Sequence, residues 1–283
     1  MNNLFIKDVK PLGKFEGMLF CTDLDGTLYK NDKTVSKQNL DAIEYFKSEG
    51  GLFTFITGRT SSTSKYICDT ISPNAPYGCF NGAGIYDISQ NRLLWNMNLP
   101  KEAQKLVLSV EKELPDIGIQ FNTDKEVYFY RDNFAMERFR ALTGTDNIYS
   151  SYEDVKDLVI KIVFAHTDEK RLESLIKLLH SHPEADKFDF VCSERTLYEV
   201  LPKGASKGNA LIKMAELLGI DINKTIAVGD YNNDVSMIKA AGVGFAVANA
   251  VPEAKAVADY ITVSNEENAI AAIIDGLDKG IYL

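Results

Sequence analysis

Short, continuously apolar segments that end in polar or glycine residues alternate along this chain with amphipathic helical patterns. Clear examples are MLFCT (18–22), the segment 52–57 within GLFTFITGR, and TIAV, which precedes Gly229 and Asp230. A continuously apolar strand is typical of a parallel sheet that is covered on both faces. Because such strands alternate here with helices, the sequence predicts an α/β core built on a mostly parallel sheet.

The pattern changes between residues 84 and 193. Segments such as GIQFNT and EVYFYR alternate apolar and polar residues, which is typical of half-exposed antiparallel strands. After LYEVLP the core pattern returns, with a strong amphipathic helix over SKGNALIKMAELLG. We therefore predict a discontinuous core, 1–83 and 194–283, that carries an inserted α+β domain over 84–193. Residues 1–17 are predicted to be an N-terminal extension that precedes the fold.

Charge and cysteine content exclude several classes of function. The formal net charge of −9 argues against nucleic-acid binding, which needs a basic surface. The four cysteines form no Cys-x-x-Cys pair, so that neither a zinc site nor a disulfide framework is indicated. No apolar stretch approaches the roughly 20 residues of a membrane helix. We expect a cytoplasmic protein with reduced thiols and no membrane association, and no feature indicates an obligate protein partner.

Two carboxylates follow the first apolar segment, one residue apart, in DLDGT. Side chains alternate along an extended chain, so Asp23 and Asp25 are expected on the same side and Leu24 on the other. Such a pair repels unless a cation or a shared proton compensates. Ligands bind at the carboxyl ends of strands in open α/β sheets, which is where this pair lies. The alternative is an ordinary acidic turn that closes a strand.

Polar groups also follow the other core strands and open a helix. ITGR provides a hydroxyl, a glycine that permits close backbone approach, and a cation; a helix N-terminus adds a lysine; and GDYNND adds two carboxylates and an amide. Each feature alone is also explained as a turn or a solvated surface. The hydroxyl, glycine and cation of ITGR suit a phosphate group. Together with Asp23, these segments place a carboxylate, a hydroxyl, a lysine and a carboxylate in that order at the ends of the core elements, and this combination is the strong signal; its residues are Thr57, Gly58, Arg59, Lys207, Asp230, Asn233 and Asp234.

These motifs together resemble the haloacid dehalogenase-like phosphohydrolase superfamily. DLDGT resembles its first motif, ITGR its second, the segment around Lys207 its third and GDYNND its fourth. The long insertion, the NGA at 81–83 and the form KGASKGNAL resemble the Cof-type branch. The resemblance implies a Rossmann-like parallel-sheet core and identifies the inserted α+β domain as a cap that closes over the substrate.

The resemblance also implies a Mg²⁺-dependent phosphatase that acts on small phosphorylated metabolites through an aspartyl-phosphate intermediate. Asp23 would be the nucleophile, and Asp25 would protonate the leaving oxygen and then activate water. The implied metal ligands are the Asp23 carboxylate, the Asp25 backbone carbonyl and the Asp230 carboxylate, with Asp234 in support. The implied phosphate-binding groups are Thr57, the amides of Leu24 and Gly58, Lys207 and Asn233. Arg59 and Asn81 are expected near the substrate cleft.

Two other functions stay open at this point. A capped phosphomutase would return the phosphoryl group to its substrate and would need cap groups for a second phosphate. A non-catalytic protein that binds phosphorylated metabolites could keep the fold without the nucleophile and the acid, both of which are present here. Sugar phosphates, nucleotides and cofactor precursors all remain possible substrates, and the sequence does not choose among them.

Overall fold

The computed structural model describes residues 13–146 and 148–282. Its central sheet has five strands in the order β14-β13-β12-β1-β2, and every neighbouring pair is parallel. The strands are β1 (Leu19–Thr22), β2 (Leu52–Phe55), β12 (Thr225–Gly229), β13 (Val243–Ala246) and β14 (Tyr260–Ile261). Strands from both ends of the chain therefore form one sheet, which confirms the predicted α/β core.

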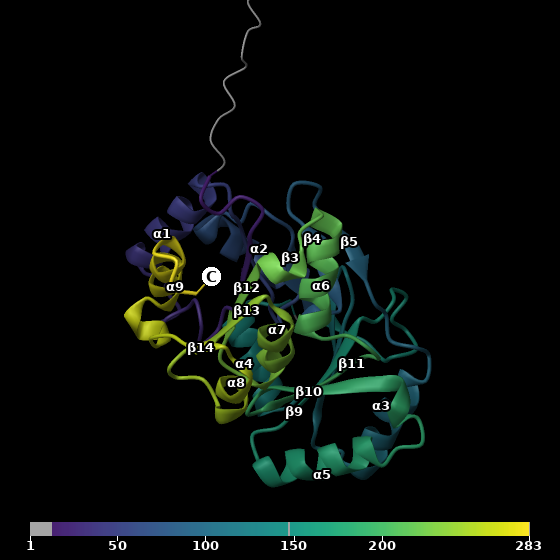
Figure 1. The fold of residues 1–283 in the computed structure, drawn as a ribbon. Coiled ribbons are helices and arrows are strands. Elements are labelled where there is room, and N and C mark those ends of the chain that lie inside the picture. The colour runs from purple at the N-terminus through teal and green to yellow at the C-terminus, as the bar shows by residue number, and fades with distance from the viewer. Residues whose placement is uncertain (1–12, 147, 283) are drawn as a thin grey trace, which may run out of the picture.

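Helices cover both faces of the central sheet (Figure 1). Side chains alternate along β1, so that Phe20 packs with Phe46 on one face, whereas Leu19 and Cys21 pack with Leu211 on the other. The first face belongs to α1 and α9, and the second to α6 and α7. The core helices are α1 (Lys37–Ser48), α2 (Ser61–Ile71), α6 (Lys207–Leu218), α7 (Val235–Ala240), α8 (Pro252–Val257) and α9 (Ala269–Asp278).

A second sheet of six strands forms the inserted cap, in the order β10-β11-β9-β6-β7-β8. Its neighbours are antiparallel except for β7 and β8. Helices α3 and α5 pack on one face and α4 on the other. The elements are α3 (Ala103–Glu113), β6 (Gly118–Asn122), β7 (Val127–Arg131), α4 (Phe134–Thr143), β8 (Ile148–Tyr149), β9 (Lys161–Ala165), α5 (Glu169–His180), β10 (Phe188–Glu194) and β11 (Leu197–Pro202).

The ends of the cap differ from the boundaries expected from the sequence. A small antiparallel sheet of β3 (Tyr77–Cys79), β4 (Gly84–Asp87) and β5 (Arg92–Asn96) crosses the boundary expected at 83/84. At the other end β11 pairs with β9 and β10, although it was expected in the core. Strand pairing depends on distant residues, and local patterns do not reveal it. We propose that the cap spans 98–202 instead of 84–193.

Residues 13–17 belong to the fold, so the extension predicted over 1–17 is too long. Phe15 is buried, its ring lies 4.6 Å from that of Phe46, and its N–H donates to the Glu49 carbonyl. Residues 1–12 lie outside the described residues. Single turns of 3₁₀ helix complete the structure: η1 (Phe80–Gly82), η2 (Ala185–Lys187), η3 (Ile222–Lys224), η4 (Asn232–Asp234) and η5 (Asn265–Glu267).

Two findings bear on the classes of protein excluded above. The four cysteines are free thiols, three of them buried and Cys192 partly exposed. Within residues 13–146 and 148–282, no helix is both long enough and apolar enough to cross a membrane.

Candidate active site

The predicted polar residues meet at one edge of the central sheet, where neighbouring strands end. Asp23 follows β1, Thr57 comes shortly after β2, and Asp230 follows β12. The order β12-β1-β2 places these ends side by side, because all three strands are parallel. Asp234 is the last residue of η4, and Lys207 is the first residue of α6. Strands remote in sequence therefore deliver their functional groups to one place.

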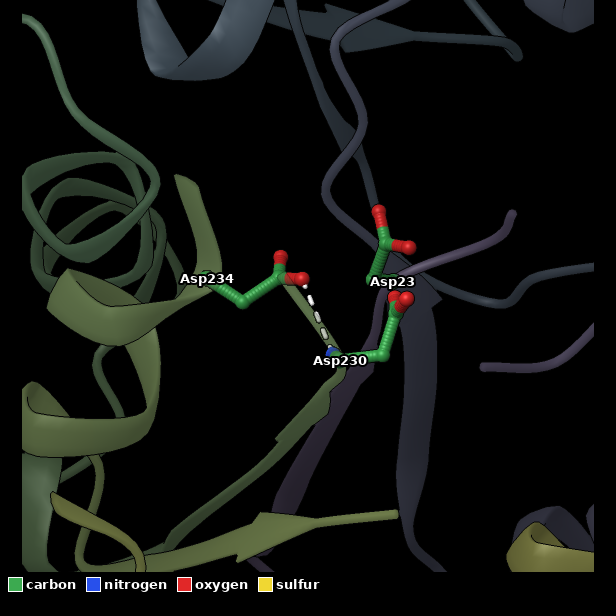
Figure 2. A group of neighbouring side chains, drawn as sticks. All are labelled: Asp23, Asp230 and Asp234. Atoms are coloured by element: carbon green, nitrogen blue, oxygen red, sulfur yellow. Dashed lines mark hydrogen bonds between the residues drawn. The ribbon is translucent and has the colours of Figure 1, made fainter. Parts of the chain in front are cut away.

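Three carboxylates form a compact group at this edge. Ligand oxygens of Asp23, Asp230 and Asp234 all lie within 4.8 Å of one another (Figure 2). The Asp234 carboxylate accepts hydrogen bonds from the N–H groups of Asp230 and Tyr231, both at 3.0 Å. These bonds fix the carboxylate against the loop that follows β12. The Thr27 hydroxyl donates to Asp230 at 3.0 Å. Oxygen ligands held this way suit a hard divalent cation such as Mg²⁺.

Lys207 is the cation that balances part of this charge. Its side chain is 1% exposed, and its Nζ lies 2.5 Å from an oxygen of Asp23 and 2.5 Å from an oxygen of Asp234. Ser206 caps α6 by accepting from the N–H of Asn209, so that the helix begins at Lys207 and directs it into the site. One ammonium faces three carboxylates, which leaves excess negative charge for a metal to neutralise.

Burial and mutual repulsion shift the pKa values of this group. Burial, with the neighbouring Asp234 and Asp230, raises the pKa of Asp23 well above its ordinary value, although Lys207 opposes the shift. Burial and Asp234 raise the pKa of Asp230 to about 7. Burial would lower the pKa of Lys207, but Asp23 and Asp234 outweigh it and raise that pKa. Each shift arises because the carboxylates are buried close together. A bound metal ion would instead favour the ionised carboxylates and lower their pKa values.

The Asp230 carboxyl predicts how cation binding depends on pH. Its pKa of about 7 lies above the ordinary value of 3.8, so the folded chain keeps a proton that the unfolded chain loses over this interval. The contribution of Asp230 to the free energy of unfolding of the cation-free protein therefore falls as pH rises from about 4 to about 7. A cation requires the ionised carboxylate, so the stabilisation that it provides grows over the same interval.

We accordingly expect Mg²⁺ to raise the thermal unfolding midpoint little at about pH 5 and most above about pH 7. Thermal unfolding with Mg²⁺ and with EDTA across this interval measures the effect. Asp230→Asn should lose most of it, and Asp41→Asn, which changes an exposed carboxylate on α1, should keep it. A Mg²⁺ effect of equal size at all pH values would contradict the role given to Asp230.

The structure gives Asp25 different partners from those of Asp23. The Arg59 guanidinium donates to both Asp25 oxygens at 3.0 Å, and Lys33 donates at 2.8 Å. Burial alone would raise the pKa of the Asp25 carboxyl, but Arg59 and Lys33 outweigh it and lower the pKa. The Asp25 side chain is 34% exposed, so it lies at the mouth of the site. Its carboxylate is not a member of the group of three.

The loop after β2 lies against Asn81, whose backbone N–H donates to the Thr57 carbonyl oxygen at 3.0 Å. A Cβ atom on Gly58 would lie 3.0 Å from the Asn81 Oδ1, so a side chain there would have to displace the Asn81 amide. Asn81 is buried in a left-handed conformation with φ of 54°, and it accepts a hydrogen bond from the Asn233 amide at 3.0 Å. Thr57, in the same loop, is buried, and Leu24 is buried between the two acids of its motif.

Three residues at the site were missed by the sequence reasoning. Lys33 reaches Asp25 from a surface turn, and no pattern in the sequence distinguishes it. Lys161 and Glu199, from the cap, form a buried ion pair beside Gly58 and Asn81. Their signal was a charged residue inside an otherwise apolar strand, in LVIKIVFA and in LYEVLP.

Comparisons with known proteins identify the family of this chain. The sequence model of a family described as haloacid dehalogenase-like hydrolase matches residues 20–274. A 5-amino-6-(5-phospho-D-ribitylamino)uracil phosphatase of Bacillus subtilis is 28% identical over 268 residues, which cover 90% of this chain and 96% of that protein. An HMP-PP phosphatase of Escherichia coli O157:H7 is 28% identical over 254 residues, covering 85% and 88%.

Solved structures show the same fold. A haloacid dehalogenase-like hydrolase from Bacillus subtilis superimposes with a TM-score of 0.79 at 26% identity, covering 91% of this chain and 99% of that one. Another, from Bacteroides thetaiotaomicron, gives a TM-score of 0.80 at 24% identity, covering 91% and 98%.

Proposed function

The chain belongs to the haloacid dehalogenase-like hydrolase family and is a phosphatase of its Cof type, and from this premise we propose that it is a Mg²⁺-dependent phosphatase that uses Asp23 as its nucleophile. The observation that carries the proposal is the buried Lys207 between Asp23 and Asp234, with Asp230 beside them. A phosphate monoester needs an aligned nucleophile, neutralised oxygens and a proton for the leaving group. In this cluster Asp23 provides the nucleophile, and Lys207 provides positive charge to neutralise the oxygens.

The first step transfers the phosphoryl group to the enzyme. An oxygen of Asp23 attacks phosphorus, the bond from phosphorus to the ester oxygen breaks, and the leaving oxygen takes a proton from Asp25. Lys207, the Thr57 hydroxyl, the Asn233 amide and the backbone N–H groups of Leu24 and Gly58 would hold the phosphoryl oxygens. In the second step Asp25 removes a proton from water, whose oxygen attacks phosphorus and releases Asp23 and phosphate.

The metal ligands proposed for Mg²⁺ are the carboxylates of Asp23 and Asp230 and the backbone carbonyl of Asp25, and Asp234 supports them. Bound there, Mg²⁺ would neutralise charge on the phosphoryl oxygens. Asp234 would act through its hydrogen bonds to the loop of Asp230. The excess of carboxylates over the single buried ammonium supports this assignment.

Asp25 must gain a proton before it can donate one, and its ion pairs oppose this. Because Arg59 and Lys33 lower the pKa of Asp25, the carboxyl is ionised in this structure. The leaving group of a bound substrate would enter beside these cations and take Asp25 away from them. Once separated from these cations, Asp25 would take up from solvent the proton that it then donates to the leaving oxygen.

We expect Asp25→Asn to lower kcat by about 10²- to 10⁴-fold while Mg²⁺ binding persists, because proton transfer by a positioned group contributes that much. Steady-state phosphate release measures turnover, and the Mg²⁺-induced shift of the unfolding midpoint measures binding. The Mg²⁺ shift serves as the control, since it depends on the Asp25 carbonyl and not on its side chain. Unchanged turnover would remove Asp25 from the acid and base roles.

The substrates proposed are small phosphorylated metabolites. Two relatives are named for such compounds, a phosphoribitylaminouracil and HMP-PP. Strand β10 of the cap packs against η4, so that the cap lies over the site and limits the size of the ester. We also propose a cytoplasmic location, which the four free thiols support.

Phosphate release from a panel of phosphorylated sugars, nucleotides and cofactor precursors tests the function. We expect release from several esters with Mg²⁺ and almost none with EDTA. A phosphomutase would instead form an isomeric ester, and a binding protein would form no product. Either outcome across the whole panel would contradict the phosphatase proposal.

A further inference from the structure

A buried ion pair joins two neighbouring strands of the cap. Glu199 of β11 lies opposite Val163 of β9, and Lys161 is two residues from Val163 on the same face. The Lys161 Nζ lies 2.8 Å from Glu199 Oε2, and the two side chains are 5% and 3% exposed. Removing two charges from water is unfavourable, and a buried ion pair is often no more stabilising than apolar side chains of the same size. A stabilising role alone therefore does not explain this pair.

Both members of the pair also bind the core. Lys161 Nζ donates to the carbonyl oxygen of Gly58 at 2.8 Å, and the Asn81 amide donates to Glu199 Oε2 at 2.7 Å. The remaining Glu199 oxygen accepts from the Ser193 hydroxyl at 2.6 Å. The pair is thus a bridge between the cap sheet and the loops that follow β2 and β3.

The Lys161 bond fixes one peptide group of the proposed phosphate-binding loop. The Gly58 carbonyl and the Arg59 N–H belong to a single planar peptide and point in opposite directions. The carbonyl is held by Lys161, and the N–H donates to the Thr57 hydroxyl oxygen at 3.2 Å. Within residues 13–146 and 148–282 the Thr57 hydroxyl accepts this bond and donates none to another residue, so its hydrogen can be donated to a phosphoryl oxygen.

The Glu199 bond fixes the other side of the loop. Asn81 donates to Glu199 through its Nδ2, and its Oδ1 accepts from the Asn233 amide at 3.0 Å. The orientation of the Asn81 amide, and through it that of Asn233, therefore depends on a carboxylate that the cap contributes. Two proposed phosphate-binding side chains, Thr57 and Asn233, are each one hydrogen-bonded group away from the cap pair.

We propose that Lys161 and Glu199 are positioning residues of the phosphatase reaction, which align Thr57 and Asn233 when the cap is seated on the core. The inference rests on the proposed function of the site. It gives the cap a part in assembling the phosphate-binding groups, in addition to enclosing the substrate. Correct alignment of such groups acts mainly on the rate of the bound complex, because a displacement of about 1 Å can lower the rate by about 10²-fold.

Two variants separate positioning from stability. Lys161→Met leaves the Glu199 carboxylate buried without its partner, so it should lower both the unfolding midpoint and kcat. The double variant Lys161→Met/Glu199→Leu removes both charges and should return the unfolding midpoint close to that of the wild type. We expect its kcat to stay about 10²-fold below the wild-type value, with KM changed by less than about threefold. Inhibition by vanadate should weaken in parallel with kcat.

The matched control is Lys125→Met, which removes an exposed cap lysine whose ammonium pairs with Asp157, also in the cap. It should leave kcat and KM unchanged. A double variant with wild-type kcat, or one in which only KM rises, would overturn the inference, even if Lys161→Met itself fails to fold. These outcomes require an active wild type. If the wild type releases no phosphate from any ester, the proposed function fails instead.

Discussion

Asp23→Asn is expected to lower phosphate release by at least about 10³-fold, because an amide cannot form the covalent intermediate that the mechanism requires. Asparagine keeps the volume of the side chain and leaves Lys207 its second partner, Asp234. The free energy of unfolding should therefore change by only about 1 kcal/mol. Loss of turnover in a well-folded variant would separate a chemical role from a structural one.

Phosphate release under saturating substrate and Mg²⁺ measures this effect, and chemical denaturation verifies the fold. The matched control is Asp41→Asn, the same substitution at an exposed position of α1, which should retain full turnover. Full turnover by Asp23→Asn itself would contradict the assignment of the nucleophile.

Lys207→Met is expected to have the second large effect, on stability as well as on turnover. It removes the ammonium from between Asp23 and Asp234 and leaves three carboxylates within 4.8 Å without a cation. Breaking a buried ion pair from one side lowers the free energy of unfolding by about 3–5 kcal/mol. Mg²⁺ should restore part of this loss, because it neutralises the same carboxylates. Turnover should stay very low even with Mg²⁺.

Chemical denaturation with Mg²⁺ and with EDTA measures the stability of this variant. Lys213→Met, on the same helix at a partly exposed position, is the matched control and should change stability by less than about 0.5 kcal/mol. If Lys207→Met were as stable as the wild type in EDTA, the buried charges would not be coupled as the distances indicate.

Most of the candidate site was predictable because its residues follow strands or open a helix. Asp23, Thr57 and Asp230 come just after β1, β2 and β12, and parallel strands bring their ends together whatever the sequence between them. Lys207 was predictable because Ser206 is a good N-cap residue, so the sequence indicates that helix α6 begins at Lys207. In these cases a local pattern was enough to place a side chain in the fold.

Contacts between distant segments were not predictable in this way. LYEVLP has the apolar character of a core strand, but β11 pairs with β9 and β10 in the cap, and only the structure reveals those partners. Lys33 meets Asp25 through a turn that resembles any solvated loop. Phe15 joins the core although residues 1–17 were predicted to precede the fold. Such contacts depend on tertiary packing, which overrides local propensity.

A phosphoryl group on Asp23 would be the most direct evidence for the proposed chemistry. Wild type and Asp25→Asn, turning over an active ester with Mg²⁺, are quenched rapidly in acid, digested and mapped by mass spectrometry. We expect a phosphoryl group on the peptide that contains Asp23, removed by hydroxylamine as an acyl phosphate should be. Active enzyme that carries the group on another residue, or on none in either protein, would contradict the central claim.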